Sequence, residues 1–144
     1  MRLLIVALLL SPLSLLADMP SMKRDNFESV RIGSSVDEQC PVSKAEVDKI
    51  WDSEMLRARL AEAGNYGNEG FLWADLDCLP ISGFDGKYVF AVKVEWSWCL
   101  VDLVQCPILI LDSSFGLGDE SFIRGAVSGH VEAAITKYLE ANLR

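Results

Sequence analysis

The chain holds 144 residues with 13 Lys and Arg, 21 Asp and Glu and a single His, which gives a formal net charge of −8 at pH 7. This acidity excludes nucleic acid as an expected partner and argues against an anionic membrane surface, because both ligands require positive charge on the protein. The length suits one domain with a hydrophobic core of its own.

The first 17 residues have the layout of a secretory signal peptide. Arg2 precedes an apolar run over 3–10, Pro12 interrupts the apolar stretch, and Ala17 stands at a plausible cleavage point. A membrane anchor is the alternative, but a spanning helix needs about 20 apolar residues and Pro12 lies inside the one candidate. We therefore expect an exported protein, periplasmic or extracellular, with no membrane span in the mature chain.

Residues 18–39 are polar and of mixed character, and we expect an N-terminal arm there. Within it, residues 27–32 are a candidate for a short edge strand. The remaining residues, 40–144, are expected to form a single α+β domain.

A helix is expected to open this domain. Ser43 is a good N-cap, and Glu46 three residues later completes a capping box. Gly64 is the expected stop. The apolar residues between these signals recur at helical spacing: Val47, Ile50, Trp51, Met55 and Ala58.

Three strands are expected next. Residues 87–99 alternate between apolar and polar, which is the pattern of a strand with one buried face, and 71–79 alternate in the same way. The Asp-Gly pair at 85–86 is the hairpin signal between them. A short apolar run predicts a third strand over 108–112, and the Gly- and Ser-rich residues 113–118 are expected to form a loop.

The last expected element is a helix from about 119 or 120 to 142, with acidic residues in its first turn as the helix dipole favours. Gly125, Gly129 and Ala133 recur at four-residue intervals, and we interpret them as a flat face that approaches the sheet or the first helix closely, rather than as a dimer contact. An apolar stripe runs along the same helix: Ile123, Val127, His130, Val131, Ala134 and Tyr138.

The order of elements predicts an α+β fold. We expect a three-stranded antiparallel meander, with or without a fourth edge strand, and an N-terminal and a C-terminal helix packed on one face (α-β-β-β-α).

Four cysteines, an even number in a chain expected to be exported, predict two disulfides. The strand pattern points Cys78 into the core and Cys99 outward, so these two are not expected to bond. Cys106 follows Cys99 closely enough for a bond to close a turn, which leaves Cys40 for Cys78. Because no C-x-x-C spacing is present, neither a zinc site nor a redox pair is indicated, and no metal or cofactor is expected.

His130 is the single histidine, so a Ser-His-Asp arrangement would have to use it as the base. No G-x-S-x-G motif marks a nucleophile, and the helix pattern favours a packed, structural role. The stretch 116–121 resembles a phosphate-binding loop in its position, yet Asp119 and Glu120 would oppose an anion there, so a flexible connector is favoured. We therefore expect no catalytic residue.

A mixed aromatic and charged surface is expected on the sheet face opposite the core, where a strand shows every second side chain. Such surfaces are typical of protein or sugar recognition, although the N-terminal arm or a loop is an alternative cover for the rings. The candidate binding residues are Phe71, Trp73, Asp75, Asp77, Lys93 and Glu95.

These features favour a small exported protein that acts by binding, as an inhibitor or immunity-type protein, with no evident catalytic centre. The expected partner is another envelope or secreted protein, and a homodimer is a further alternative. The second hypothesis is a carboxylate-dependent hydrolase of envelope polymers that uses two of Asp75, Asp77, Glu95 and Asp112. Alternating acids on a half-exposed strand explain the first two without catalysis.

Overall fold

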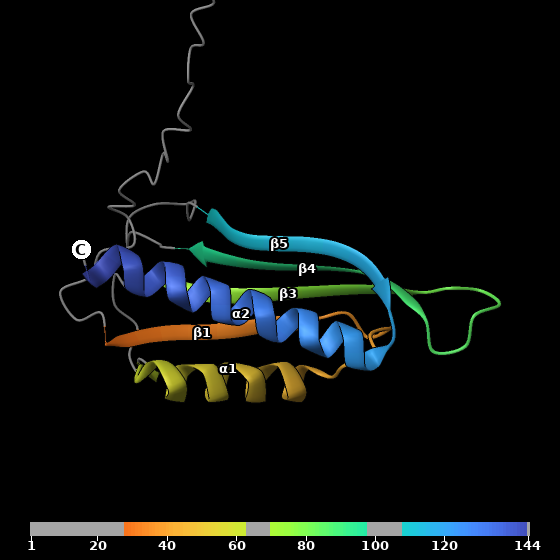
Figure 1. Ribbon diagram of the computed structural model, residues 1–144, viewed down its shortest axis with the longest axis horizontal. Helices are drawn as coiled ribbons and strands as arrows, with labels where there is room; N and C mark the ends of the chain where they lie inside the picture. Colours follow the sequence, from red (N-terminus) through yellow and green to blue (C-terminus); the bar gives the residue numbers. More distant parts are fainter. Residues whose placement is uncertain (1–27, 63–69, 98–107, 144) are drawn as a thin grey trace, which may run out of the picture.

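The structure, a computed structural model, describes residues 28–62, 70–97 and 108–143 (Figure 1). The predicted signal peptide and the predicted Cys99–Cys106 bond lie outside these residues. The elements in chain order are β1 (Ser29–Val36), α1 (Lys44–Ala58), β2 (Ala61–Glu62), β3 (Phe71–Pro80), β4 (Tyr88–Ser97), β5 (Ile108–Gly118) and α2 (Glu120–Leu143).

The strands form one mixed sheet in the order β2-β1-β3-β4-β5. β1 runs parallel to both β2 and β3, whereas β3, β4 and β5 form an antiparallel meander. The path from β1 through α1 to β3 is therefore a crossover, as a parallel pair requires. The α+β class and the two helices on one face are as expected. The prediction of a three-stranded antiparallel sheet is wrong, because the sheet has five strands and β1 is parallel to its neighbours.

The position of β1 inside the sheet was not predicted from the sequence. Residues 29–36, placed by the sequence in a polar arm with an edge strand, lie inside the sheet, and Arg31–Val36 are in register with Phe71–Leu76 of β3. Ser34 is buried there, and its hydroxyl donates a hydrogen bond to Oδ1 of Asp48 on α1. Val30, Ile32 and Val36 also face the core, so Ser34 interrupts an otherwise alternating strand, and its hydrogen bond to Asp48 makes its burial tolerable.

Both helices cover the same face of the sheet (Figure 1). The side chains of β3 and β4 that point toward them are buried: Leu72, Ala74, Leu76, Cys78, Phe90, Val92, Val94 and Trp96. The ring of Trp96 packs against Tyr138 of α2 with centroids 5.5 Å apart. The predicted apolar face of the two strands is therefore confirmed, but at the end of β4 two residues of the opposite face, Glu95 and Ser97, are buried as well.

The expected start of α1 is confirmed, and its expected end is wrong. The side chain of Ser43 accepts from the backbone N–H of Glu46, and the Glu46 carboxylate accepts from the backbone N–H of Ser43. The helix stops at Ala58, because Arg59 adopts a left-handed conformation with φ of 57°. This turn brings Ala61 beside Glu28, whose carbonyl accepts from the Ala61 N–H at 2.7 Å.

β5 continues through the residues that the sequence assigns to a loop. It pairs with β4 as far as Gly118, so the flexible-connector interpretation is wrong. The glycines serve close packing, since a Cβ at Gly118 would lie 2.5 Å from the Phe122 ring and one at Gly116 would lie 3.0 Å from Phe90. Glycine is needed here because two aromatic rings rest on the strand.

The apolar stripe of α2 is buried except for His130, which is partly exposed. Gly125 and Gly129 are exposed, and a Cβ added at either position would meet no atom within 4 Å. The interpretation of these glycines as a flat packing face is therefore wrong.

Cys40 and Cys78 form the predicted disulfide, with their Cα atoms 4.9 Å apart. Cys40 precedes α1 and Cys78 lies on the core side of β3, so the bond fixes the entrance of the helix to the sheet. In the described part of the chain, no helix is long and apolar enough to span a membrane.

Replacing both bonded cysteines (Cys40→Ser with Cys78→Ser) is expected to lower the free energy of unfolding by about 4 kcal/mol, because the open chain regains the entropy of a long loop. The two residues are 38 positions apart. Urea unfolding of the variant and of the wild type, both without reductant, measures the difference. A loss below about 1 kcal/mol would contradict a stabilising role for the bond.

Gly125→Ala and Gly129→Ala are each expected to raise the free energy of unfolding by about 0.5–1 kcal/mol, because alanine restricts the unfolded chain and meets open space in the helix. Thermal unfolding followed by circular dichroism measures the gain. Gly118→Ala is the matched control and is expected to destabilise, since its Cβ would meet the Phe122 ring.

Candidate functional site

The sheet face turned away from α1 and α2 carries the candidate binding residues, and we name it the open face. It is formed by the odd-numbered residues of β1, β3 and β4. On β5 the pairing shifts opposite Val94 and Glu95, which makes Leu111 the extra residue of a bulge. The open face of β5 therefore holds Ile108 and Ile110 before the bulge and Ser113, Phe115 and Leu117 after it.

The structure places all six candidate binding residues on the open face. Lys93 is the centre of the charged group, because its Nζ lies 3.0 Å from Oδ2 of Asp75 and 2.9 Å from Oε2 of Glu95. The indole Nε1 of Trp73 donates to Oδ1 of Asp75 at 2.9 Å. Phe71 meets Trp73 edge to face, with ring centroids 6.1 Å apart.

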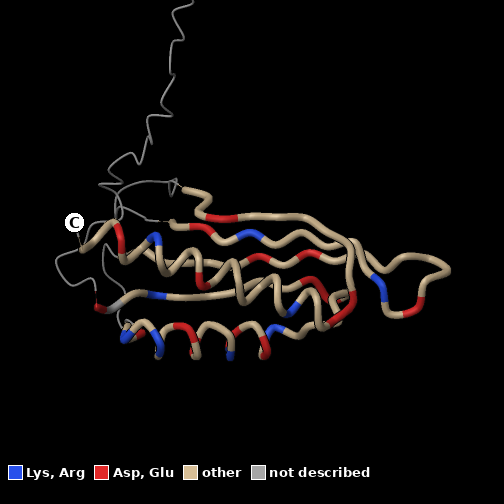
Figure 2. Tube along the Cα trace, viewed as in Figure 1, with Lys and Arg blue, Asp and Glu red and all other residues tan. Residues whose placement is uncertain are grey.

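The charged side chains of this cluster pair mostly with one another. The hydrogen bonds that Lys93 donates to Glu95 and to Asp75 raise the pKa of its ammonium group, and the bond to Glu95 has the larger effect. The Glu95 side chain is only 10% exposed. Figure 2 shows that acidic positions outnumber basic ones along β3 and β4. Asp77 is the exception, since it is exposed and has no ion-pair partner among the described residues.

Trp73 is half-buried because its ring lies over β1. A Cβ built on Gly33 would be 2.2 Å from Cζ3 of Trp73, so the indole occupies the space that a side chain would need. The aromatic pair therefore covers the sheet itself and leaves only part of its surface to a ligand.

The four carboxylates of the hydrolase hypothesis do not converge. Asp75 and Glu95 share the cation of Lys93, whereas Asp112 points to the helix side of the sheet, toward His130. A hydrolase that pairs Asp112 with an open-face acid is therefore not supported by this arrangement. The Asp75 and Asp77 pair stays a prediction.

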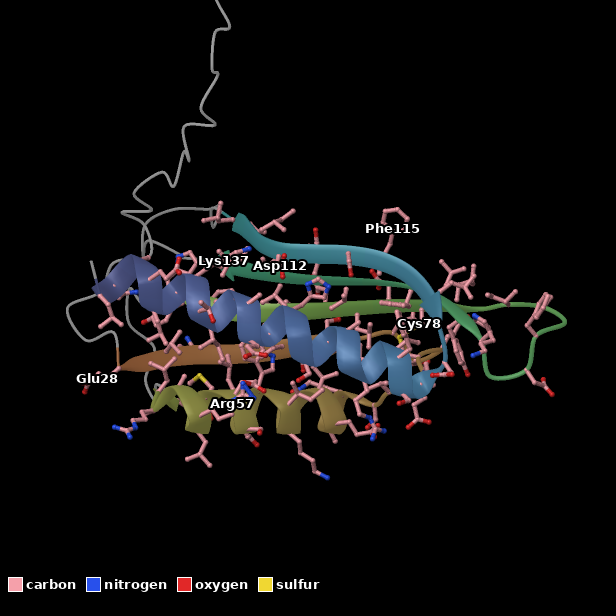
Figure 3. All side chains as sticks on the ribbon, in the orientation of Figure 1. Glu28, Arg57, Cys78, Asp112, Phe115 and Lys137 are labelled. Carbon is pink, nitrogen blue, oxygen red and sulfur yellow. A yellow bond between two sulfur atoms is a disulfide. The ribbon has the colours of Figure 1, made fainter. Side chains whose placement is uncertain are left out.

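An apolar group that the sequence did not single out lies at the hairpin end of the open face. Across three strands, Val89 of β4 pairs with Leu79 on one side and Leu117 on the other. In the next row Ala91 pairs with Phe115, which is 85% exposed and projects away from the helices (Figure 3). We name these five residues the hairpin-end patch. The alternation of Ser113, Phe115 and Leu117 was the available signal, obscured by the neighbouring glycines.

A second group, which we name the α2 polar cluster, lies on the helix side of β5. Nδ1 of His130 is 2.9 Å from Oδ2 of Asp112, and Nε2 is 2.6 Å from the hydroxyl of Ser114. The Lys137 ammonium donates to the carbonyl of Leu111 and lies 3.7 Å from Oδ1 of Asp112 (Figure 3). Ser114 could not be linked to His130 from sequence, because that requires β5 to continue past 112.

Among the described residues no group of three or more His, Cys, Asp and Glu side chains could hold a metal ion. No protein-family model matches the chain, and no curated protein matches it. Among solved structures the chain is similar to the rare lipoprotein B from Shewanella oneidensis, with 11% identity, 78% of this chain and 91% of that chain covered, and a TM-score of 0.39. So distant a likeness carries no argument about function, which has to be inferred from this chain's own residues.

Lys93→Met is expected to lower the free energy of unfolding by about 1 kcal/mol at pH 7, because Asp75 and Glu95 lose their shared cation. Folding raises the pKa of Lys93 above its ordinary value of 10.5, so this stabilisation is present at neutral pH and is lost as the pH rises through the raised pKa. Urea unfolding at pH 7 and at pH 11 measures it.

The double variant Lys93→Met with Glu95→Gln is the control, and it should recover part of the loss because one of the two facing negative charges is gone. A difference between Lys93→Met and wild type that stays the same at pH 11 would contradict the ion-pair explanation.

Proposed function

We propose that this protein acts by binding another exported protein, and that the hairpin-end patch of the open face is its docking surface. The observation that carries the proposal is the exposure of Phe115, the most exposed large hydrophobic side chain in the described part of the chain. It lies among Leu79, Val89 and Leu117, each of which is also exposed.

Exposed apolar side chains that adjoin one another favour a partner on energetic grounds. Burying one large apolar side chain completely contributes about 1.5–3 kcal/mol, and aromatic anchors at the centre of an interface contribute most of the binding energy. Monomeric proteins rarely leave such groups uncovered unless the surface has a use. Leu56 on α1, in contrast, is an isolated exposed residue, which is ordinary for a protein surface.

The edge of β5 adds a second means of attachment. In the described sheet β5 has a neighbour only on its β4 side, so its other edge offers unpaired backbone groups to an extended segment. Natural edge strands are often blocked by charges or proline. The 11 residues of β5 contain one charged residue, Asp112, and no proline, so this edge is open to strand addition.

Charge favours a partner that differs from the protein itself. Asp77 stands beside the patch without an ion-pair partner in the described chain, and the whole chain carries a net charge of −8. Two copies facing each other would bring like charges together, whereas an apolar segment flanked by Lys or Arg would match both features. The predicted signal peptide supports a partner in the periplasm or outside the cell.

A photo-crosslinking phenylalanine analogue at position 115, introduced in the native host, is expected to capture one protein partner. The same analogue at position 56, which is 79% exposed on α1, is the matched control and is expected to capture none. Binding of the captured partner to the purified protein should then weaken at least about tenfold for Phe115→Ser and stay unchanged for Leu56→Ser.

Asp77→Lys should weaken the same binding more strongly at low salt than at high salt, because it removes an attraction that ions screen. The proposal is overturned if position 115 captures nothing, captures a second copy of this chain, or captures a partner whose affinity does not respond to Phe115→Ser.

A further inference from the structure

His130 is held between two side chains of β5. Asp112 and Ser114 are two positions apart on that strand, so both point to the helix side, where α2 presents the imidazole. Nδ1 faces the carboxylate at 2.9 Å and Nε2 faces the hydroxyl at 2.6 Å. The ring therefore links an acid and an alcohol through its two nitrogens.

This connectivity is the one that acyl transfer by serine requires. A carboxylate at Nδ1 selects the tautomer that carries its proton there, which leaves the lone pair of Nε2 to accept from the serine hydroxyl. Both distances lie within the range for a nucleophile, its base and the group that orients the base. Lys137 in turn lies 3.7 Å from the second oxygen of Asp112, which helps to fix the carboxylate.

The serine is accessible to a small substrate. Ser114 is exposed, and Gly129, which precedes His130, leaves space open because a Cβ there would meet no atom within 4 Å. β5 has no neighbour on its outer side in the described sheet. Because amide groups alternate in direction along a strand, an outward N–H lies either on Ser114 itself or on the residues next to it, where it can donate to an oxyanion.

An apolar surface adjoins the nucleophile. Phe122 is exposed, and its ring lies 3.9 Å from where a Cβ of Gly116 would stand, next to the ring of Phe90. Gly116 is two positions from Ser114 on the same side of β5, so a short aliphatic acyl chain on Ser114 would face the rings that rest on Gly116. The site therefore suits carboxylic esters with short aliphatic acyl chains.

We propose that Ser114, His130 and Asp112 form a nucleophilic triad that hydrolyses small carboxylic esters. The Ser114 oxygen attacks the ester carbonyl while Nε2 of His130 takes the hydroxyl proton. The tetrahedral intermediate then expels the alcohol, which receives that proton and leaves an acyl group on Ser114. Water attacks the acyl-serine through the same base, which releases the carboxylic acid and restores the hydroxyl.

Labelling of the full-length protein with a fluorophosphonate tests the nucleophile directly. The serine oxygen displaces fluoride from phosphorus, and mass spectrometry is expected to find the adduct on Ser114. Ser114→Ala should abolish labelling. Ser113→Ala is the matched control, because the neighbouring hydroxyl lies on the open face, and it should label at the wild-type rate.

The base and its orienting acid are tested by the rate of the same reaction. His130→Gln should slow labelling at least about 100-fold, and Asp112→Asn at least about tenfold. With p-nitrophenyl esters, a burst of one equivalent of p-nitrophenolate is expected, faster for butyrate than for acetate, and Phe122→Ser should remove that preference. Circular dichroism confirms that each variant is folded.

The proposal is overturned if Ser114 acquires no adduct, or if a folded His130→Gln variant labels as fast as the wild type, because the hydroxyl would then be merely exposed. Either outcome is independent of the docking surface, since Ser114 and Phe115 point to opposite faces of β5.

Discussion

The burial of one face of β3 and β4 beneath two helices is the constraint on which the rest of the structure depends. Trp96 of β4 lies against Tyr138 of α2, and Trp51 of α1 is fully buried beside the same sheet. The Cys40–Cys78 bond then fixes the start of α1 to β3. Since both helices are used on one side, the described chain has nothing left to cover the other side.

One-sided packing gives neighbouring residues of β5 different roles. Ser114 belongs to the α2 polar cluster, and Phe115 belongs to the hairpin-end patch, although they are adjacent in sequence. The bulge at Leu111 sets this phase, because in a strand without a bulge Ile110 and Phe115, which are five positions apart, would lie on opposite faces. The side chains proposed for binding and for acyl transfer therefore lie on two faces of one strand, although both proposals also use its free edge.

The excess of acidic residues is accommodated by sharing cations. Lys93 is shared by Asp75 and Glu95 on the open face. Two arginines do the same between the helices: Arg124 contacts Glu46 and Glu120, and Arg57 contacts Glu54 and Glu132. Hydrogen bonds from Ser43 lower the pKa of Glu46, so the capping box also favours its charged form. Asp77, in contrast, is exposed and has no ion-pair partner among the described residues.

The sequence by itself determined the elements whose signals are local: the capping box at Ser43, the alternation of β3 and β4, and, through that alternation, the pairing of Cys78 with Cys40. Tertiary structure alone decided that residues 29–36 pair in parallel inside the sheet and that β5 continues through its glycines to place Ser114 under His130. The physical reason is distance along the chain. A capping box or an alternating strand is stabilised by neighbours within a few residues, whereas a polar strand becomes stable only through hydrogen bonds to another strand, and a glycine-rich one only when distant rings pack upon it.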